Sequence, residues 1–238
     1  MRIAPPVLTF LTLSLSLVRA SICLPAESSD KIYANLAGEV LLENDRLRVE
    51  RFSVRPGQST GPHSRAAGRL LVIIKGGLLA SNYSQRATLW KDGSVFWQSE
   101  GAPDAGSTNI GTVPLQLIWV TPKPVTVKNP QADSESQHLG YPNVPGEDLL
   151  ENEILIVQRF VLKPGQWEGV HAHGPNSLYI FVRGGQWISK TYTNPKQASG
   201  NSPDGSVGWM PPSVITEGHQ SGNVGKHPSE VVWVILKK

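Results

Sequence analysis

The sequence contains a single cysteine and no cluster of basic residues. Cys23 is the one cysteine among 238 residues, which excludes disulfides and cysteine-ligated zinc within one chain. Exported proteins without disulfides are ordinary in bacteria, so the composition favours a bacterial source. Because lysine and arginine are nowhere clustered with interleaved aromatic residues, we do not expect the protein to bind nucleic acid.

The chain also lacks an apolar run of the roughly 20 residues that a transmembrane helix needs, so no stable membrane span is expected. Its start instead has the pattern of a secretory signal peptide, with Arg2 before an apolar stretch over residues 7–18 and Ala20 at the cleavage position. Cleavage after Ala26 is an alternative. We therefore expect residues 1–20 to be removed and the mature protein to be exported, to the periplasm or out of the cell.

Cys23 leaves a lipoprotein as a weaker alternative for the exported form. Ile22 precedes this cysteine and is bulkier than the residue that usually stands before a lipid-attached cysteine. The expected product is therefore a protein without a lipid anchor.

Long helical periodicity is missing as well, while glycine and proline are abundant, at 23 and 19 residues. This composition predicts short strands separated by turns. Apolar or alternating stretches of strand length predict strands at residues 47–54, 70–74, 115–120, 155–162, 178–182 and 230–236. The predicted fold class is all-β, as a sandwich, jelly roll or barrel.

Many motifs recur in register, which indicates a tandem duplication. Residues 41–58 match residues 149–166 at a constant offset of 108, as from Gly57 to Gly165. Further matches in the same order pair residues 75–77 with 183–185, 92–95 with 204–207, Trp97 with Trp209, Asn109 with Asn223, and Trp119 with Trp233.

The repeat divides the mature chain into two domains. We expect one domain over residues 21–121, a linker rich in proline and polar residues over 122–148, and a second domain over 149–238. His138 lies in this linker and is given no role.

A short segment of the second copy carries most of the chemistry. His171 and His173 are two residues apart in a stretch that otherwise has the pattern of a strand. Since alternate side chains of an extended chain point to the same face, these two imidazoles face one point in space. A sheet-based protein builds part of a metal site in this way.

The order of motifs resembles the cupin superfamily, and the two copies make the chain similar to a bicupin. The motifs are a Pro-Gly turn, a His-x-His pair, an apolar strand ending in Gly, an Asp-Gly-Ser-Val turn, and a later His followed by Asn-x-Gly. The resemblance covers nearly all of the mature chain. It implies two tandem jelly-roll β-barrels, with the metal, when present, inside the barrel, and it is compatible with a homodimer.

The resemblance also implies a three-histidine metal site in the second barrel. His171 and His173 match the family's first motif, and His219, with Asn223 four residues later, matches the second. The family's glutamate position falls on Ser177, which is a departure from the pattern.

The identity of the third ligand depends on how a long turn is aligned. The turn that precedes His219 is longer than usual in the family, and one alignment places Thr216 at the histidine position. We prefer His219, because Asn223 then agrees with Asn109 of the first copy.

Three neutral imidazoles suit Zn(II), Fe(II), Cu(II), Ni(II) or Mn(II) and leave positions open for water or substrate. Without the glutamate the metal keeps its full charge, which favours an anionic substrate or hydroxide. Glu168 does not replace the missing carboxylate, because strand parity puts it on the opposite face from His171 unless Gly169 introduces a bulge. The alternative is a pocket that these histidines line without a metal.

Three further side chains are candidates for the wall of this pocket. Ser177 is placed to hydrogen-bond a bound water. Tyr179 has the same parity as Ser177, and is either a proton donor or a core aromatic with a satisfied hydroxyl. Trp167 has the parity of His171 and is a candidate to wall the pocket.

The first copy is predicted to have lost the site. In place of His171, His173, Ser177 and His219 it has His63, Arg65, Arg69 and Ala105. One histidine beside two cations does not hold a divalent metal well, so His63 is expected to be a remnant of the site or a polar group with its hydrogen bonds satisfied. Arg65 and Arg69 either bind an anion or are solvated near the barrel mouth.

Two functions from different classes fit the sequence. The first is a metal-dependent dioxygenase or oxidase that acts on a small organic substrate. The second is a non-catalytic protein that binds a small molecule or has a structural role. In both cases the expected partner is a small molecule.

Overall fold

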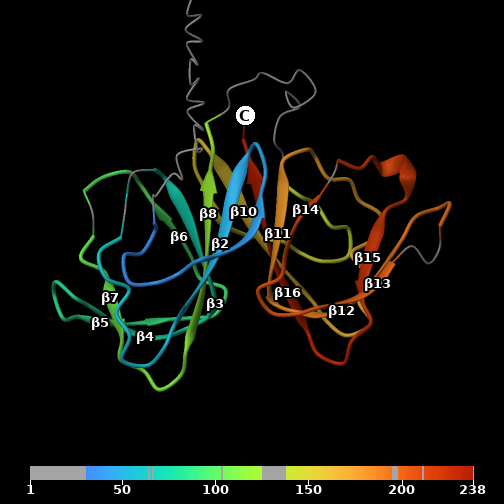
Figure 1. The fold of residues 1–238 in the computed structure, drawn as a ribbon. Coiled ribbons are helices and arrows are strands. Elements are labelled where there is room, and N and C mark those ends of the chain that lie inside the picture. The colour runs from blue at the N-terminus through green and yellow to red at the C-terminus, as the bar shows by residue number, and fades with distance from the viewer. Residues whose placement is uncertain are drawn as a thin grey trace, which may run out of the picture.

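The computed structural model describes residues 31–63, 65, 67–102, 104–124, 138–194, 198–210 and 212–237. The predicted signal peptide, Cys23 and residues 125–137 of the predicted linker lie outside these residues. The described chain forms two β-barrels that lie side by side (Figure 1). It contains no helix with the length and apolar character needed to cross a membrane.

The first barrel has one large and one small sheet. Its strands are β1 (Glu39–Glu43), β2 (Leu47–Val54), β3 (Arg69–Lys75), β4 (Gly77–Ser81), β5 (Ala87–Trp90), β6 (Val95–Gln98), β7 (Ser107–Asn109) and β8 (Leu115–Pro122). The large sheet has the order β1-β2-β8-β3-β6 and the small sheet the order β5-β4-β7. Their pairings are antiparallel.

The second barrel has the same strand order. Its elements are β9 (Glu147–Glu151), β10 (Leu155–Leu162), β11 (Ser177–Arg183), β12 (Gly185–Lys190), β13 (Ala198–Ser202), β14 (Val207–Met210), the 3-10 helix η2 (Ile215–Glu217), β15 (Gln220–Asn223) and β16 (Ser229–Leu236). The sheets have the orders β9-β10-β16-β11-β14 and β13-β12-β15. The predicted all-β fold of two jelly-roll barrels is confirmed.

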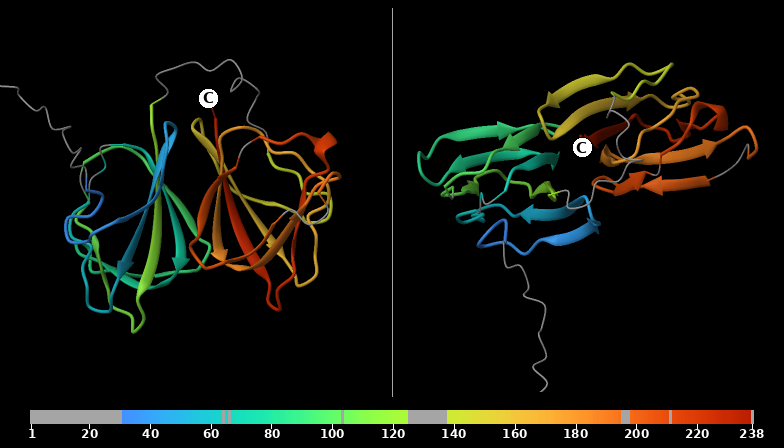
Figure 2. Two further views of the ribbon diagram at one scale, coloured as in Figure 1. Left: turned by 45° about the vertical axis from the view of Figure 1, so that its right-hand side comes forward. Right: turned by 90° about the horizontal axis from the view of Figure 1, so that it is seen from above.

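The large sheets of the two barrels pack against each other and share a core (Figure 2). In this core, Leu70 and Val72 of β3 lie in one cluster with Leu178 and Ile180 of β11, and all four are fully buried. Burying one such aliphatic side chain stabilises a fold by about 1.5–3 kcal/mol. The contact therefore joins the barrels into one stable unit.

Each barrel also has its own interior core. In β11, Leu178 and Ile180 face the other barrel, whereas Tyr179 and Phe181 belong to the interior cluster of the second barrel. Because successive side chains of a strand point to opposite faces, both faces of these strands are covered. This explains why the central strands of the large sheets are apolar almost without interruption.

The end of the predicted linker belongs to the second barrel. Leu139, Tyr141 and Val144 are at most 8% exposed and lie in its interior core. The first barrel has its counterpart in Tyr33 and Leu36, which are buried in its own interior. The prediction of a linker up to residue 148 is therefore wrong for residues 138–148, because three isolated apolar residues among glycines and prolines give no strand pattern.

His138, for which no role was expected, lies at the surface of this segment. Its Nε2 is 3.5 Å from Asp148 Oδ2 and 3.4 Å from Glu151 Oε2. The contacts tie the start of the second barrel to the strand β9.

Candidate metal centre and its cavity

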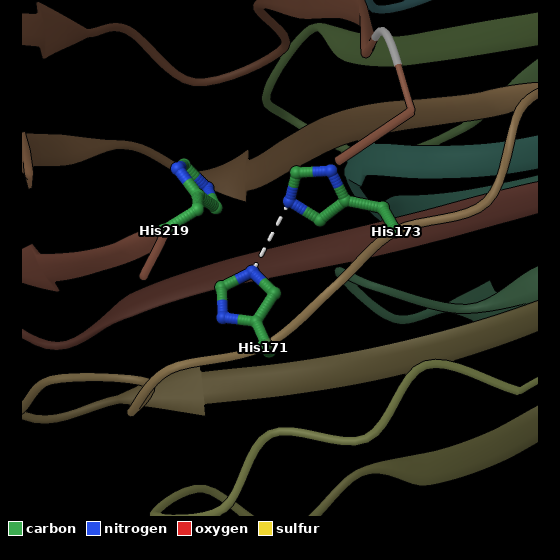
Figure 3. A group of neighbouring side chains, drawn as sticks. All are labelled: His171, His173 and His219. Atoms are coloured by element: carbon green, nitrogen blue, oxygen red, sulfur yellow. Dashed lines mark hydrogen bonds between the residues drawn. The ribbon is translucent and has the colours of Figure 1, made fainter. Parts of the chain in front are cut away.

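The three predicted ligands meet inside the second barrel (Figure 3). His171 and His173 lie in the loop between β10 and β11, and His219 lies between η2 and β15. The backbone N–H of His171 donates to the carbonyl of His219 (3.1 Å), and His173 forms an isolated β-bridge with Ser213. Backbone contacts thus hold both ends of the His-x-His pair, although it is not part of a regular strand.

The imidazole nitrogens converge on one point. Nε2 of His171 and Nε2 of His173 are 3.1 Å apart, and one nitrogen from each of the three rings lies within 4.8 Å of the others. Two nitrogens bound to one transition metal at about 2.1 Å lie roughly 3.0–3.4 Å apart. The His171–His173 pair therefore has the spacing of two ligands of one such ion, and His219 lies near enough to be the third.

Contacts behind the rings orient two of the ligands. Nδ1 of His171 is 2.9 Å from the carbonyl oxygen of Gly169, which only accepts hydrogen bonds, so Nδ1 carries the proton and Nε2 is left free for a metal. Nδ1 of His173 lies 3.2 Å from the hydroxyl of Ser213, and its ring stacks on Trp233 at 5.7 Å. Such contacts behind the ligands strengthen metal binding.

The site is buried. His171 and His173 are 2% and 4% exposed. Burial lowers the pKa of His171 to about 4, although its hydrogen bond to Gly169 raises it. Burial also lowers the pKa of His219, against the effect of Glu217. His171 and His219 are therefore neutral at pH 7, which is the form of imidazole that binds a metal.

The sides on which Glu168 and Trp167 lie are the reverse of those predicted from strand alternation. Gly169 has φ +84°, and this turn of the backbone breaks the alternation before His171. As a result Glu168 lines the cavity beside the histidines, whereas Trp167 does not. The ring of Trp167 covers Gly222 instead, with Nζ of Lys190 at 4.1 Å from its centroid. The prediction of Trp167 as a pocket wall is therefore wrong, and Glu168 follows the alternative in which Gly169 breaks the alternation.

The carboxylate of Glu168 is held next to the imidazoles. Its Oε2 accepts a hydrogen bond from the N–H of Ser221 (3.1 Å) and lies 3.8 Å from Nε2 of His171. Burial raises its pKa to about 8, while Ser221 and the hydroxyl of Tyr141 lower it. Burial and the neighbouring Glu168 raise the pKa of Tyr141 well above its ordinary value.

The histidines open into a cavity of about 280 Å³. Its aromatic and apolar walls come from strands of both sheets of the barrel and from the segment before β9. These residues are Tyr141, Tyr179, Phe181, Trp187, Met210, Val231 and Trp233, and the polar residues besides the histidines are Glu168, Ser189, Ser202 and Ser221. None of the described lining residues is a lysine or arginine.

Of the remaining two pocket candidates, Tyr179 lines the cavity and Ser177 does not. Tyr179 is part of the wall, with its hydroxyl directly over Gly208. Ser177 is buried and shares the face of Tyr179, but it does not line the cavity, and its hydroxyl donates to the carbonyl of Gly174 (3.2 Å). The hydroxyl of Ser177 thus stabilises the loop that carries His171 and His173.

The first barrel has a different polar cluster at the corresponding place. The amide Nε2 of Gln98 donates to Nε2 of His63 (2.6 Å), and the backbone N–H of His63 donates to the carbonyl of Asp104 (3.1 Å). The second contact corresponds to that of His171 with His219, so Asp104, rather than Ala105, takes the place of His219.

The two arginines of the first copy are partly or fully enclosed. Arg69 is 3% exposed, which corrects its description as a solvated residue, and Nε of Arg65 donates to the carbonyl of Ser99 (3.1 Å). Burial lowers the pKa of His63, as do Arg65 and Arg69, while Asp104 raises it. Among the described residues, the three histidines of the second barrel form the one group of three or more metal-type ligands.

Comparisons with known proteins identify the fold. No family model matches the sequence, and no curated protein matches it. Among solved structures, a cupin 2 conserved barrel domain protein from Leptotrichia buccalis is 11% identical, with a TM-score of 0.53 over 86% of this chain and 90% of that chain. AerE from Microcystis aeruginosa is 10% identical, with a TM-score of 0.60 over 87% of this chain and 95% of that chain.

A third similar structure is an oxalate decarboxylase from Bacillus subtilis, a protein with Mn(II) centres. It is 12% identical, with a TM-score of 0.50 over 87% of this chain and 76% of that chain. At identities this low the likeness concerns the fold. The chain has the cupin fold, in the form with two barrels, as the sequence motifs predicted.

Proposed function

We propose that the second barrel binds one divalent transition-metal ion through His171, His173 and His219. The observation that carries this proposal is the convergence of three imidazoles on a single cavity, with two of the rings oriented from behind. Iron, manganese, zinc, nickel and copper are the candidates, since all accept neutral imidazole ligands.

Metal analysis of the purified protein tests this site. We expect about one equivalent of metal in the wild type and a loss of most of it in His173→Ala, because two imidazoles bind far more weakly than three. His227→Ala is the matched control, since His227 is exposed and is not a member of the three-histidine group. Equal metal content in the wild type and His173→Ala would refute the site.

We propose further that the metal-loaded protein is a dioxygenase or oxidase acting on a small organic compound. When bound, the metal would supply Lewis-acid or redox chemistry. The chain's own contribution is to hold the ion with three imidazoles, to enclose the substrate between aromatic walls and to present the carboxyl group of Glu168 to it.

Oxygen consumption tests this second step. The iron- or manganese-loaded wild type should consume oxygen with at least one compound from a panel of small acids and polyphenols, and His219→Ala should not. Binding of a compound without turnover under any metal would support the alternative, a protein that binds a small molecule without catalysis.

We also propose that the protein is exported, on the pattern of residues 1–20. Expression of the full chain with a C-terminal tag should yield a product that begins after Ala20 in the periplasm or medium. N-terminal sequencing measures this, and an intact N-terminus in the cytoplasm would contradict it.

A further inference from the structure

The walls, charge and size of the cavity indicate the kind of molecule that it binds. We infer that the ligand is a small aromatic compound with a hydroxyl group, and that Glu168 selects it by receiving this hydroxyl. The inference rests on the proposed function in that it concerns the cavity of the proposed metal site.

The first step concerns the walls. Ring contacts link Trp187 to Phe181 (centroids 5.1 Å apart) and Phe181 to Tyr179 (5.6 Å). Tyr179 in turn contacts Trp233 (5.7 Å), which stacks on His173. These rings line the cavity in a connected series that reaches a ligand histidine. An aromatic molecule gains both apolar burial and favourable ring contacts from such walls.

The second step concerns charge. Small dicarboxylates are bound in proteins by arginine or lysine, which supply the opposite charge and several hydrogen bonds. No lysine or arginine lines this cavity in the described chain, and the acidic residue in its lining is Glu168, 4% exposed. Ionised, Glu168 repels a carboxylate ligand, and protonated, it offers a single donor. A hydroxyl both donates and accepts, so it pairs with a carboxyl group in either form.

The third step concerns position. The Oε2 of Glu168 is 3.8 Å from Nε2 of His171 and is anchored by the N–H of Ser221. Glu168 is not a member of the group of ligands that lie within 4.8 Å of one another. It therefore lies beside the three imidazoles, where it receives a hydroxyl of a molecule that occupies the cavity in front of them.

The fourth step concerns size. Ligand pockets for larger molecules span about 300–1,000 Å³. The cavity of about 280 Å³ lies just below this range, which fits a compound with one ring.

Calorimetric titration of the metal-free protein with two one-ring probes tests the inference. Catechol carries hydroxyls and benzoate carries a carboxylate, and we expect catechol to bind the wild type at least tenfold more tightly at pH 7. Glu168→Gln keeps the side-chain shape and an acceptor for the N–H of Ser221 but loses the acidic group. We expect it to reduce the preference for catechol over benzoate at least fivefold. Glu153→Gln, at an exposed carboxylate, should leave this preference unchanged.

Several results would overturn the inference. They are no binding of catechol, benzoate bound as tightly as catechol, or a preference that Glu168→Gln leaves intact. If Glu168→Gln does not fold, Trp187→Leu serves as a second variant, and its affinity for catechol should fall at least fivefold; an unchanged affinity would contradict the proposed wall. These titrations contain no metal, so a negative result would leave the proposed metal site unaffected. Conversely, finding that the purified protein binds no metal would leave the inference about the hydroxylated aromatic ligand unaffected.

Discussion

The two histidines of the His-x-His pair are oriented by different kinds of group. His171 is held by a backbone carbonyl, which no substitution removes, and His173 by the hydroxyl of Ser213. The ring of His173 therefore depends on a side chain that mutation can test.

We expect Ser213→Ala to weaken metal affinity by roughly 10–100-fold, the usual effect of losing a group that orients a ligand. Competition with a chromogenic chelator measures this affinity. Ser84→Ala, at an exposed serine of the first barrel, is the control. An unchanged affinity in Ser213→Ala would mean that Trp233 alone orients the ring of His173.

His63 makes the stability of the protein depend on pH. Burial lowers its pKa in the folded protein, while the unfolded chain has an ordinary pKa near 6.5. As pH falls below about 6.5, the unfolded chain takes up a proton that the folded protein does not, so the free energy of unfolding decreases until His63 is protonated in the folded state too. Asp104 moderates this effect, and Arg65 and Arg69 strengthen it.

His63→Gln should therefore lose less stability than the wild type between pH 6.5 and pH 5. Urea denaturation at a series of pH values measures the difference. Parallel curves for the two proteins would show that His63 does not titrate differently on folding.

The candidate ligands could be predicted from the sequence, whereas the position of Glu168 could not. The spacing of His171 and His173 follows from the geometry of extended chain, and the motif resemblance pointed to His219. The place of Glu168 depends on the sign of φ at Gly169. Glycine adopts either sign with similar ease, so the sequence left both outcomes open.

At the scale of elements, the loop from β10 to β11 depends on close packing at Gly169. A Cβ at this position would come within 3.0 Å of Pro142 and Asn143, in the segment before β9. Gly165, in the turn just after β10, also has a positive φ of 76° but has open space around it. A comparison of alanine substitutions at these two positions therefore distinguishes the cost of backbone strain from the cost of steric contact.

We expect Gly165→Ala to destabilise the protein by about 1 kcal/mol, the cost of a positive φ in a residue with a Cβ. Gly169→Ala should cost about 1–3 kcal/mol more, because Pro142 and Asn143 must move as well, and it should also lower metal content. Urea denaturation and metal analysis of both variants measure the effects. Equal stability of the two variants would contradict the close packing.

The three central strands of each large sheet were predicted, whereas the edge strands and the strands of the small sheets were not. The predicted stretches 47–54 and 155–162 coincide with β2 and β10. In contrast, β5 is largely exposed and β15 has the sequence QSGN. Such strands are held by hydrogen bonds to neighbours and bury too little apolar surface to leave a pattern in the sequence.

At the scale of the whole molecule, stability depends on the core between the barrels. Ile180 is fully buried in it, whereas Val161 on β10 is 44% exposed. We expect Ile180→Ala to lower the free energy of unfolding by about 2–5 kcal/mol and Val161→Ala by less than about 1 kcal/mol. Urea denaturation measures both, and similar losses would argue against a shared core.

The shared core should also make unfolding cooperative. Tryptophan fluorescence and circular dichroism should follow one transition, because neither large sheet keeps its buried face when the other barrel unfolds. Two separate transitions would show that the barrels are independent. The packing of the barrels could not be predicted from the repeat, since the repeat gives two folds and no relative arrangement.

The pairing of two unlike barrels has a consequence for stoichiometry. In an assembly of identical barrels, any change at a ligand position would be present in every copy. Here the first barrel has Arg65 and Asp104 where the second barrel has His173 and His219. The interior of the first barrel can therefore change to serve structure alone, without affecting the ligands. Any ion held by the three imidazoles is consequently held once per chain, and its neighbour barrel serves as scaffold without competing for it.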